Sequence, residues 1–103
     1  MSNWLRVCRI EEIAPDKARV VSIEGVRVAV FRTRDGECYA IEDRCPHRGA
    51  PLSQGVIYQK NKVACLDHGW GICLLDGQVE APQRGQVRTF KVKVEAQTVW
   101  VKS

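Results

Sequence analysis

The chain has 103 residues, of which 45% are hydrophobic and 27% charged, and its 16 Lys and Arg against 12 Asp and Glu give a formal net charge of +4 at pH 7. This length supports one domain with a modest core and excludes a second, independent catalytic domain. The basic residues are dispersed and form no long run, which argues against nucleic-acid binding. We expect most of them to lie on solvated strand faces, while some could help the chain to dock on an acidic partner.

Short strands are predicted throughout the first 42 residues. Residues 10–13 could form one helical turn. In residues 26–33 valine alternates with other side chains at the period of two that is typical of a half-buried strand. Turn signals at Glu24-Gly25 and at the pair Asp35-Gly36 separate neighbouring strands. The strands predicted in this part are residues 4–8, 17–23, 26–33 and 38–42.

The second half begins with residues 48–55, a segment too rich in Gly and Pro for a regular strand or helix, which is predicted to be a loop. Two short hairpins follow, and a polar connection over residues 81–85 leads to the last strands. About nine or ten short strands with closely spaced turns predict an all-β fold, either an antiparallel sandwich or a partly closed barrel. The strands predicted here are residues 56–59, 62–65, 70–75, 78–80, 86–94 and 98–102.

The sequence shows no sign of a signal peptide or of a membrane span. The first six residues lack the apolar stretch of a signal peptide, and no apolar run approaches membrane-spanning length, so we expect a cytoplasmic protein without membrane contact. In a reducing compartment the cysteines Cys8, Cys38 and Cys73 are predicted to be buried thiols and not disulfides.

Two short boxes in the middle of the chain carry the chemistry. Cys45-Pro46-His47 is followed, after seventeen residues, by Cys65-Leu66-Asp67-His68, and together they contain both histidines. Thiolates favour zinc, cuprous copper or iron–sulfur clusters, and imidazole suits zinc or iron. A zinc finger normally uses a Cys pair and a His pair, whereas each box here offers one Cys and one His. The boxes therefore predict a mixed Cys and His metal site, with a structural zinc module as an alternative.

The pattern Cys-x-His followed by Cys-x-x-His resembles the Rieske family of [2Fe-2S] proteins, in which two histidines replace two cysteines on one iron. The resemblance implies one [2Fe-2S] cluster per chain, with Cys45 and Cys65 on the inner iron and His47 and His68 on the outer one. Because all four ligands are used, it also implies a one-electron relay that is not catalytic alone. Further residues that carry the resemblance are Gly49, Pro51, Leu52, Gly55, Gly69 and Trp70.

The resemblance also implies how the single domain, residues 1–103, is organised. Residues 1–42 and 81–103 would form an all-β base, and residues 43–80 would form an inserted lobe that binds the cluster.

Three positions near the boxes bear on the reduction potential. High-potential Rieske proteins of respiratory complexes carry two disulfide-bonded cysteines and a serine where this chain has Ala50, Asp67 and Trp70. The resemblance therefore predicts a potential near the negative end of the Rieske range of roughly −150 to +300 mV.

Two kinds of Rieske protein of about this length are similar to the chain. One is the small subunit of assimilatory NAD(P)H-dependent nitrite reductase, a part of nitrate assimilation, which would dock on a large flavin and siroheme subunit that reduces nitrite to ammonia. The other is a free ferredoxin that takes electrons from a ferredoxin reductase and delivers them to an aromatic-ring dioxygenase. Pro46 favours the nitrite reductase subunit, since dioxygenase ferredoxins usually have Thr there, and residues 45–55 and 87–90 also support it. One residue departs from the pattern of the Rieske family: Leu66 stands where the second box usually has Pro. A structural metal-binding or scaffold subunit is a further alternative.

Overall fold

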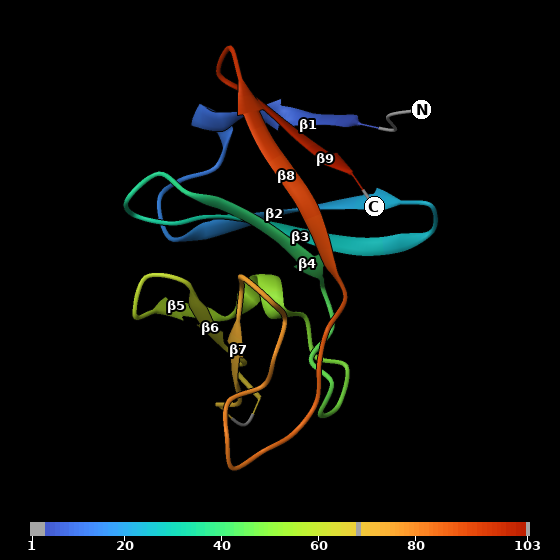
Figure 1. The fold of residues 1–103 in the computed structure, drawn as a ribbon, viewed down its shortest axis with the longest axis vertical. Coiled ribbons are helices and arrows are strands. Elements are labelled where there is room, and N and C mark those ends of the chain that lie inside the picture. The colour runs from blue at the N-terminus through green and yellow to red at the C-terminus, as the bar shows by residue number, and fades with distance from the viewer. Residues whose placement is uncertain (1–3, 68, 103) are drawn as a thin grey trace.

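The computed structural model describes residues 4–67 and 69–102, and it confirms the all-β class. A six-stranded antiparallel sheet with the order β1-β9-β8-β4-β3-β2 curves into a nearly closed barrel, and a three-stranded sheet with the order β5-β6-β7 packs beside it (Figure 1). The strands are β1 (Leu5–Arg9), β2 (Lys17–Ile23), β3 (Val26–Arg32), β4 (Cys38–Glu42), β5 (Val56–Tyr58), β6 (Lys62–Ala64), β7 (Gly71–Cys73), β8 (Thr89–Glu95) and β9 (Thr98–Lys102).

Strand β3 is buried on both faces, which corrects the prediction of a half-buried strand. Val28, Ala29, Val30 and Phe31 are all at most 1% exposed. Successive side chains of a strand point to opposite faces, so Val28 and Val30 enter the barrel interior while Ala29 and Phe31 face the small sheet. Both faces of β3 are apolar because the small sheet and its loops cover the outer face of the barrel at this strand.

Two hydrophobic cores follow from this arrangement. One fills the barrel, and the other lies between the barrel and the small sheet with its loops. The buried residues of the first are Cys8, Ile13, Ile23, Val28, Val30, Ala40, Phe90, Val99 and Val101. Those of the second are Ala29, Phe31, Ile41, Cys45, Leu52, Val63, Cys65, Ile72, Leu74 and Val87.

The segment between β7 and β8 forms less strand than the sequence predicts. The hairpin expected over residues 70–80 is reduced to β7 and one bridge between Ile72 and Val79, and β8 begins at Thr89. The intervening chain turns back on itself, because the amide of Val79 donates to Gly85 and that of Val87 donates to Gly77. These bonds replace the ladder that a longer hairpin would have made.

Two single turns of 3-10 helix complete the described elements. The first, η1 (Ile10–Glu12), confirms the predicted helical turn, and the side chain of Glu12 accepts the amide of Arg9 at 2.8 Å. The second, η2 (Leu52–Gln54), lies inside the predicted loop and buries Leu52 completely in the second core.

The six-stranded sheet uses strands from both ends of the chain, and the three-stranded sheet lies between them in sequence. The exact division into a base and a lobe stays a prediction. Among the described residues no helix is long and apolar enough to cross a membrane.

Candidate metal centre

The loops at Cys45 and Cys65 are closed by the same two kinds of backbone hydrogen bond. In the first loop the amide of Gly49 donates to the carbonyl of Cys45 at 2.7 Å, and the amide of Cys45 donates to Ala50 at 2.8 Å. In the second, the amide of Gly69 donates to Cys65 at 2.8 Å, and the amide of Cys65 donates to Trp70 at 2.9 Å. Each loop is thus a closed turn that starts at a cysteine.

Both turns need a glycine at their fifth residue. Gly49 and Gly69 have φ angles of 77° and 73°, in the left-handed region that residues with a Cβ seldom adopt. A Cβ on Gly69 would meet no atom within 4 Å, so the requirement there comes from the backbone conformation and not from crowding.

The turns place both cysteines in the second core. Cys45 and Cys65 are 1% and 2% exposed, and their thiols interact with each other. Burial raises the pKa of the Cys45 thiol above its ordinary value; the amide of His47 opposes this, the Cys65 thiol adds to it, and the amide of Arg48 opposes it. A metal that binds here must therefore displace a proton, after which the same two amides stabilise the thiolate.

His47 is tied to the second loop by an aromatic contact. Its ring stacks on that of Trp70, with centroids 4.5 Å apart and planes inclined by 21°, and its Nδ1 atom is buried. Trp70 also supplies the carbonyl that closes the turn at Cys65. One residue of the second loop thus orients a predicted ligand of the first.

The fourth predicted ligand, His68, lies outside the described residues. The structure therefore brings together Cys45, Cys65 and, through Trp70, His47. Within residues 4–67 and 69–102 no three His, Cys, Asp or Glu side chains are grouped closely enough to hold one metal ion.

A buried carboxylate that the sequence analysis missed anchors the first loop. The side chain of Asp43 is completely buried; its Oδ1 accepts the amide of Ser53 at 2.7 Å and its Oδ2 accepts the Ser53 hydroxyl at 2.9 Å. Arg27 of β3 approaches Oδ2 at 3.4 Å. The two bonds from Ser53 join the two ends of the segment 43–53, which contains the first box. An acidic residue two positions before Cys45 was the only sequence signal for it.

A second missed group supports the other loop. The hydroxyl of Tyr58 donates to Glu80, and Lys62 donates to the other oxygen of the same carboxylate at 2.8 Å. These side chains lie directly over Gly71, where a Cβ would collide with the Tyr58 hydroxyl and the Glu80 carboxylate. The start of β7, immediately after Trp70, is fixed by this contact.

The donor set fits an iron–sulfur cluster with mixed ligands. The two thiols are buried and interact with each other, the amides of His47 and Arg48 favour the thiolate of Cys45, and the half-buried His47 imidazole stacks on an indole ring. Soft thiolates and imidazole are the donors that such clusters take, and amides near the sulfur are a known means of tuning the potential.

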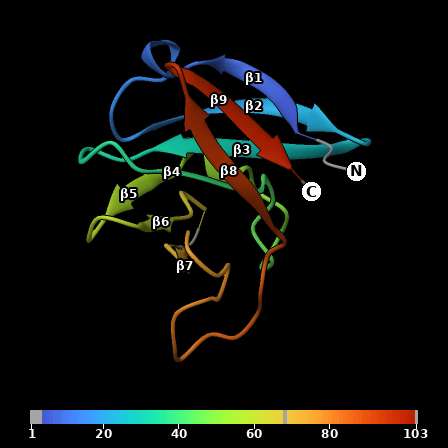
Figure 2. The same ribbon diagram turned by 45° about the horizontal axis from the view of Figure 1, so that its top comes forward.

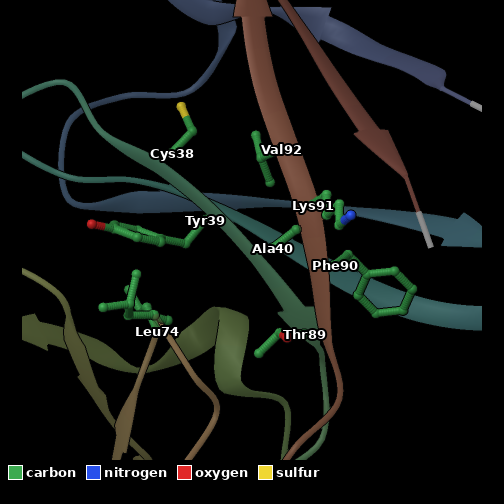
Figure 3. A pocket seen from close by; sticks show the side chains of 9 residues that line it. Cys38, Tyr39, Ala40, Leu74, Thr89, Phe90, Lys91 and Val92 are labelled. Carbon is green, nitrogen blue, oxygen red and sulfur yellow. The ribbon is translucent and has the colours of Figure 1, made fainter.

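The other cysteines lie away from this site. Cys8 is fully buried as predicted, whereas Cys38 and Cys73 are only partly buried. Cys38 lines a hollow of about 450 Å³ between β4 and β8, together with Tyr39, Leu74 and Val92 (Figure 3). Burial raises the pKa of the Cys38 thiol, which lowers its reactivity. None of the described box residues lines this hollow.

Several known proteins are similar to the chain over nearly its whole length. Two curated relatives are the 4beta-methylsterol monooxygenase of Methylococcus capsulatus, 37% identical, and the biphenyl dioxygenase ferredoxin subunit of Pseudomonas sp. strain KKS102, 30% identical. Both alignments cover 96% of this chain, but they span 30% of the monooxygenase and 91% of the ferredoxin.

A similar solved structure is that of a protein assigned as the small subunit of an NADPH nitrite reductase. It is 27% identical, with a TM-score of 0.88, and the alignment covers 98% of this chain and 99% of that one. Residues 3–91 match the family of the Rieske [2Fe-2S] domain, whose members carry one such cluster per domain. With this match and the two cysteine loops, the chain belongs to the Rieske [2Fe-2S] domain family.

Proposed function

We propose that the chain is the small subunit of an NAD(P)H-dependent nitrite reductase, an enzyme that converts nitrite to ammonia. Rieske-type electron transfer is the general activity that its family supports. In the specific role proposed here, the chain would carry or gate single electrons within a complex whose large subunit holds flavin and siroheme. The chain alone would have no substrate site.

We assign Cys45 and Cys65 as ligands of the inner iron, and His47 and His68 as ligands of the outer iron. The bound cluster supplies storage for one electron. The residues of the chain hold it and control its surroundings: the amides of His47 and Arg48 stabilise the Cys45 thiolate, and Trp70 covers one face of the His47 ring. Since both thiolates would be buried and His47 is only half-buried, electrons would enter and leave on the histidine side.

The observation that carries the nitrite reductase role is the contact between Pro46 and Gly85. A Cβ built on Gly85 would lie 3.3 Å from Cβ of Pro46, so the connection after β7 packs directly on the first box. Pro46 is the residue that favours the nitrite reductase subunit, since dioxygenase ferredoxins usually have Thr there, and residues 87–90, which also favour it, follow Gly85 by two positions.

The proposal includes three further points. The division into a base of residues 1–42 and 81–103 and a lobe of residues 43–80 is part of it. So is a cytoplasmic location, where the nicotinamide donor and a siroheme subunit would be present. The third is a potential near the negative end of the Rieske range, because Ala50, Asp67 and Trp70 provide neither a disulfide nor a hydroxyl donor.

A dioxygenase ferredoxin is the second candidate. The observation in its favour is the 30% identity to the biphenyl dioxygenase ferredoxin subunit over 91% of that protein. In this role the partners would be a ferredoxin reductase and an oxygenase.

Reconstitution with purified partners tests the proposal. We expect the chain to co-purify with a large flavin and siroheme subunit and to raise its NAD(P)H-dependent reduction of nitrite, and we expect a Cys65→Ser variant to bind without raising the rate. Failure to bind any such subunit, combined with electron delivery from a ferredoxin reductase to an oxygenase, would replace the nitrite reductase role by the ferredoxin role. Equal rates with wild type and Cys65→Ser would leave only a scaffold role.

A further inference from the structure

The outer face of the barrel has two unlike halves. Over β3 and β4 it is apolar, and Ala29, Phe31 and Ile41 pack there against the small sheet. Over β1, β9 and β8 it is not covered by the small sheet. In Figures 1 and 2, β1 and β9 lie on the far side of the barrel from β5, β6 and β7.

The register of the strands places five side chains on the uncovered half, and contacts with two of them place Trp4 there as well. Val99 and Val101 of β9 are fully buried in the barrel, so Trp100 and Lys102 between and beyond them point outward. Trp100 pairs with Lys93 of β8 on one side and with Arg6 of β1 on the other. We call this surface the basic face; its residues are Trp4, Arg6, Lys91, Lys93, Trp100 and Lys102.

The cations of the basic face are crowded together. Lys91 and Lys102 are directly opposite each other across the ladder of β8 and β9, an arrangement of like charges that destabilises a sheet. Lys102 and Lys93 also share one ring, since their Nζ atoms lie 5.7 and 4.6 Å from the centroid of Trp4. Among the described residues the one acid that forms an ion pair with this face is Glu95, which contacts Lys93 at 3.4 Å.

The basic face accounts for most of the net charge of the chain. It holds four of the 16 Lys and Arg, and Glu95 pairs with one of them, so the face with this acid carries +3 of the formal net charge of +4. Most of the excess positive charge therefore lies on one face of one sheet. A concentration of one sign of charge steers and orients a partner of the other sign.

Two of the three tryptophans of the chain also lie on this face. Trp4 and Trp100 are partly exposed and belong to neither hydrophobic core. Trp and Arg are enriched at the centres of protein interfaces, and Lys is more common at their rims. An aromatic centre with cations around it has the composition of a docking surface.

We propose that the basic face docks on an acidic protein surface of the large subunit with which the chain forms its electron-transfer complex. This inference rests on the proposed function for the identity of the partner. Because β1 and β9 lie across the barrel from the small sheet, a partner centred on them would leave the Cys45 and Cys65 loops uncovered. Attachment to the complex and electron exchange would then use separate surfaces.

Two double variants with the same loss of charge test the proposal. Lys91→Gln with Lys102→Gln changes the basic face, and Lys17→Gln with Lys60→Gln removes two exposed lysines from β2 and from the turn after β5. The dissociation constant for the purified large flavin and siroheme subunit is measured for both variants and the wild type at low and high NaCl concentration.

We expect the first variant to bind about 3- to 10-fold more weakly at low salt, the range for two exposed charge pairs, and the control to bind like the wild type. High salt should weaken the wild type and reduce the difference. The visible spectrum of the cluster and the electron-transfer rate at saturation should be unchanged, and the first variant should be at least as resistant to thermal unfolding as the wild type, since it relieves a repulsion.

Equal affinities for all three proteins would overturn the docking role of the face and leave the proposed function intact. A wild-type chain that does not bind the large subunit would overturn both. If sedimentation shows that the wild type forms a dimer which the first variant cannot form, the occupant is a second copy of the chain, and the proposal of an acidic partner is wrong.

Discussion

The loops at Cys45 and Cys65 are closed by the same backbone hydrogen bonds and differ in what supports them. The loop at Cys45 is held by a polar anchor, the buried Asp43 carboxylate that binds both the amide and the hydroxyl of Ser53. The loop at Cys65 is flanked by an aromatic stack, that of Trp70 on His47, and is followed by a hydrogen-bonded pair, Tyr58 with Glu80, that lies over Gly71. The comparison indicates that the closed turn positions each cysteine, and that different surroundings can support the same turn.

The largest expected effect is the loss of a cysteine from either loop. Cys45→Ser and Cys65→Ser should each lower the iron content of the purified protein from about two per chain to nearly none, because each removes a buried thiolate ligand. Cys38→Ser, in the hollow between β4 and β8, is the matched control and should keep its iron. Full retention of iron by both loop variants, measured by elemental analysis, would contradict the assignment.

Removal of the Asp43 carboxylate should have the next largest effect. Asp43→Ala leaves the Ser53 amide and hydroxyl without their buried acceptor, and we expect it to lower the free energy of unfolding by about 2–4 kcal/mol. Asp43→Asn, which keeps one acceptor, should lose less. Glu37→Ala, an exposed carboxylate, should change the free energy by less than about 0.5 kcal/mol. If denaturant unfolding gives Asp43→Ala and Glu37→Ala the same free energy of unfolding, the Asp43 carboxylate does not stabilise the fold.

Removal of the Trp70 ring should have a smaller effect, and it should change the stability of the bound cluster and not that of the fold. Trp70→Leu removes the stack on His47, whereas Trp70→Phe keeps an aromatic ring there. Since such a stack contributes about 0.5–1.5 kcal/mol beyond burial, the cluster of the Leu variant should be lost to a chelator about 2- to 12-fold faster than that of the wild type. The Phe variant should be nearer the wild type. Identical rates in all three proteins would show that Trp70 does not position His47.

The smallest effect concerns the hydroxyl above Gly71. Burial and the neighbouring Glu80 raise the pKa of Tyr58 to about 12, above the ordinary value near 10. The folded state therefore favours the neutral phenol, so this contribution to stability is fully present below about pH 10 and is lost as the pH rises toward 12. Ultraviolet titration of wild type and Tyr58→Phe should assign the late step to Tyr58. A Tyr58 that ionises near pH 10 would mean that its contact with Glu80 is not formed.

Most of the fold could be predicted from the sequence because its signals are local. Period-two alternation and turn pairs such as Glu24-Gly25 depend on neighbouring residues, and nearly all the predicted strands exist. The prediction failed where the partner was distant. The alternation in β3 cannot indicate that a second layer buries its outer face. Residues 86–88 were predicted as part of the strand that begins at Thr89, but they form only the isolated bridge between Gln86 and Gln78.

The same distinction applies to the site. The composition and spacing of the two Cys and His boxes predict a metal site, and the structure brings Cys45 and Cys65 together. The supports were not predictable, since Asp43 meets Ser53 and Tyr58 meets Glu80 only after folding, across 10 and 22 positions of the sequence. The basic face was equally hidden, because its four cations come from three strands and become neighbours only through the register of β1, β9 and β8.

The measurement that tests the central claim most directly is the visible and low-temperature EPR spectrum of the purified protein, before and after dithionite. We predict a red-brown protein whose reduced form gives the EPR signal of a histidine-ligated [2Fe-2S] cluster, with nitrogen couplings in the pulsed spectrum that His47→Cys reduces. A colourless, EPR-silent protein that contains zinc or no metal would contradict the account, and the electron-transfer role would have to be withdrawn.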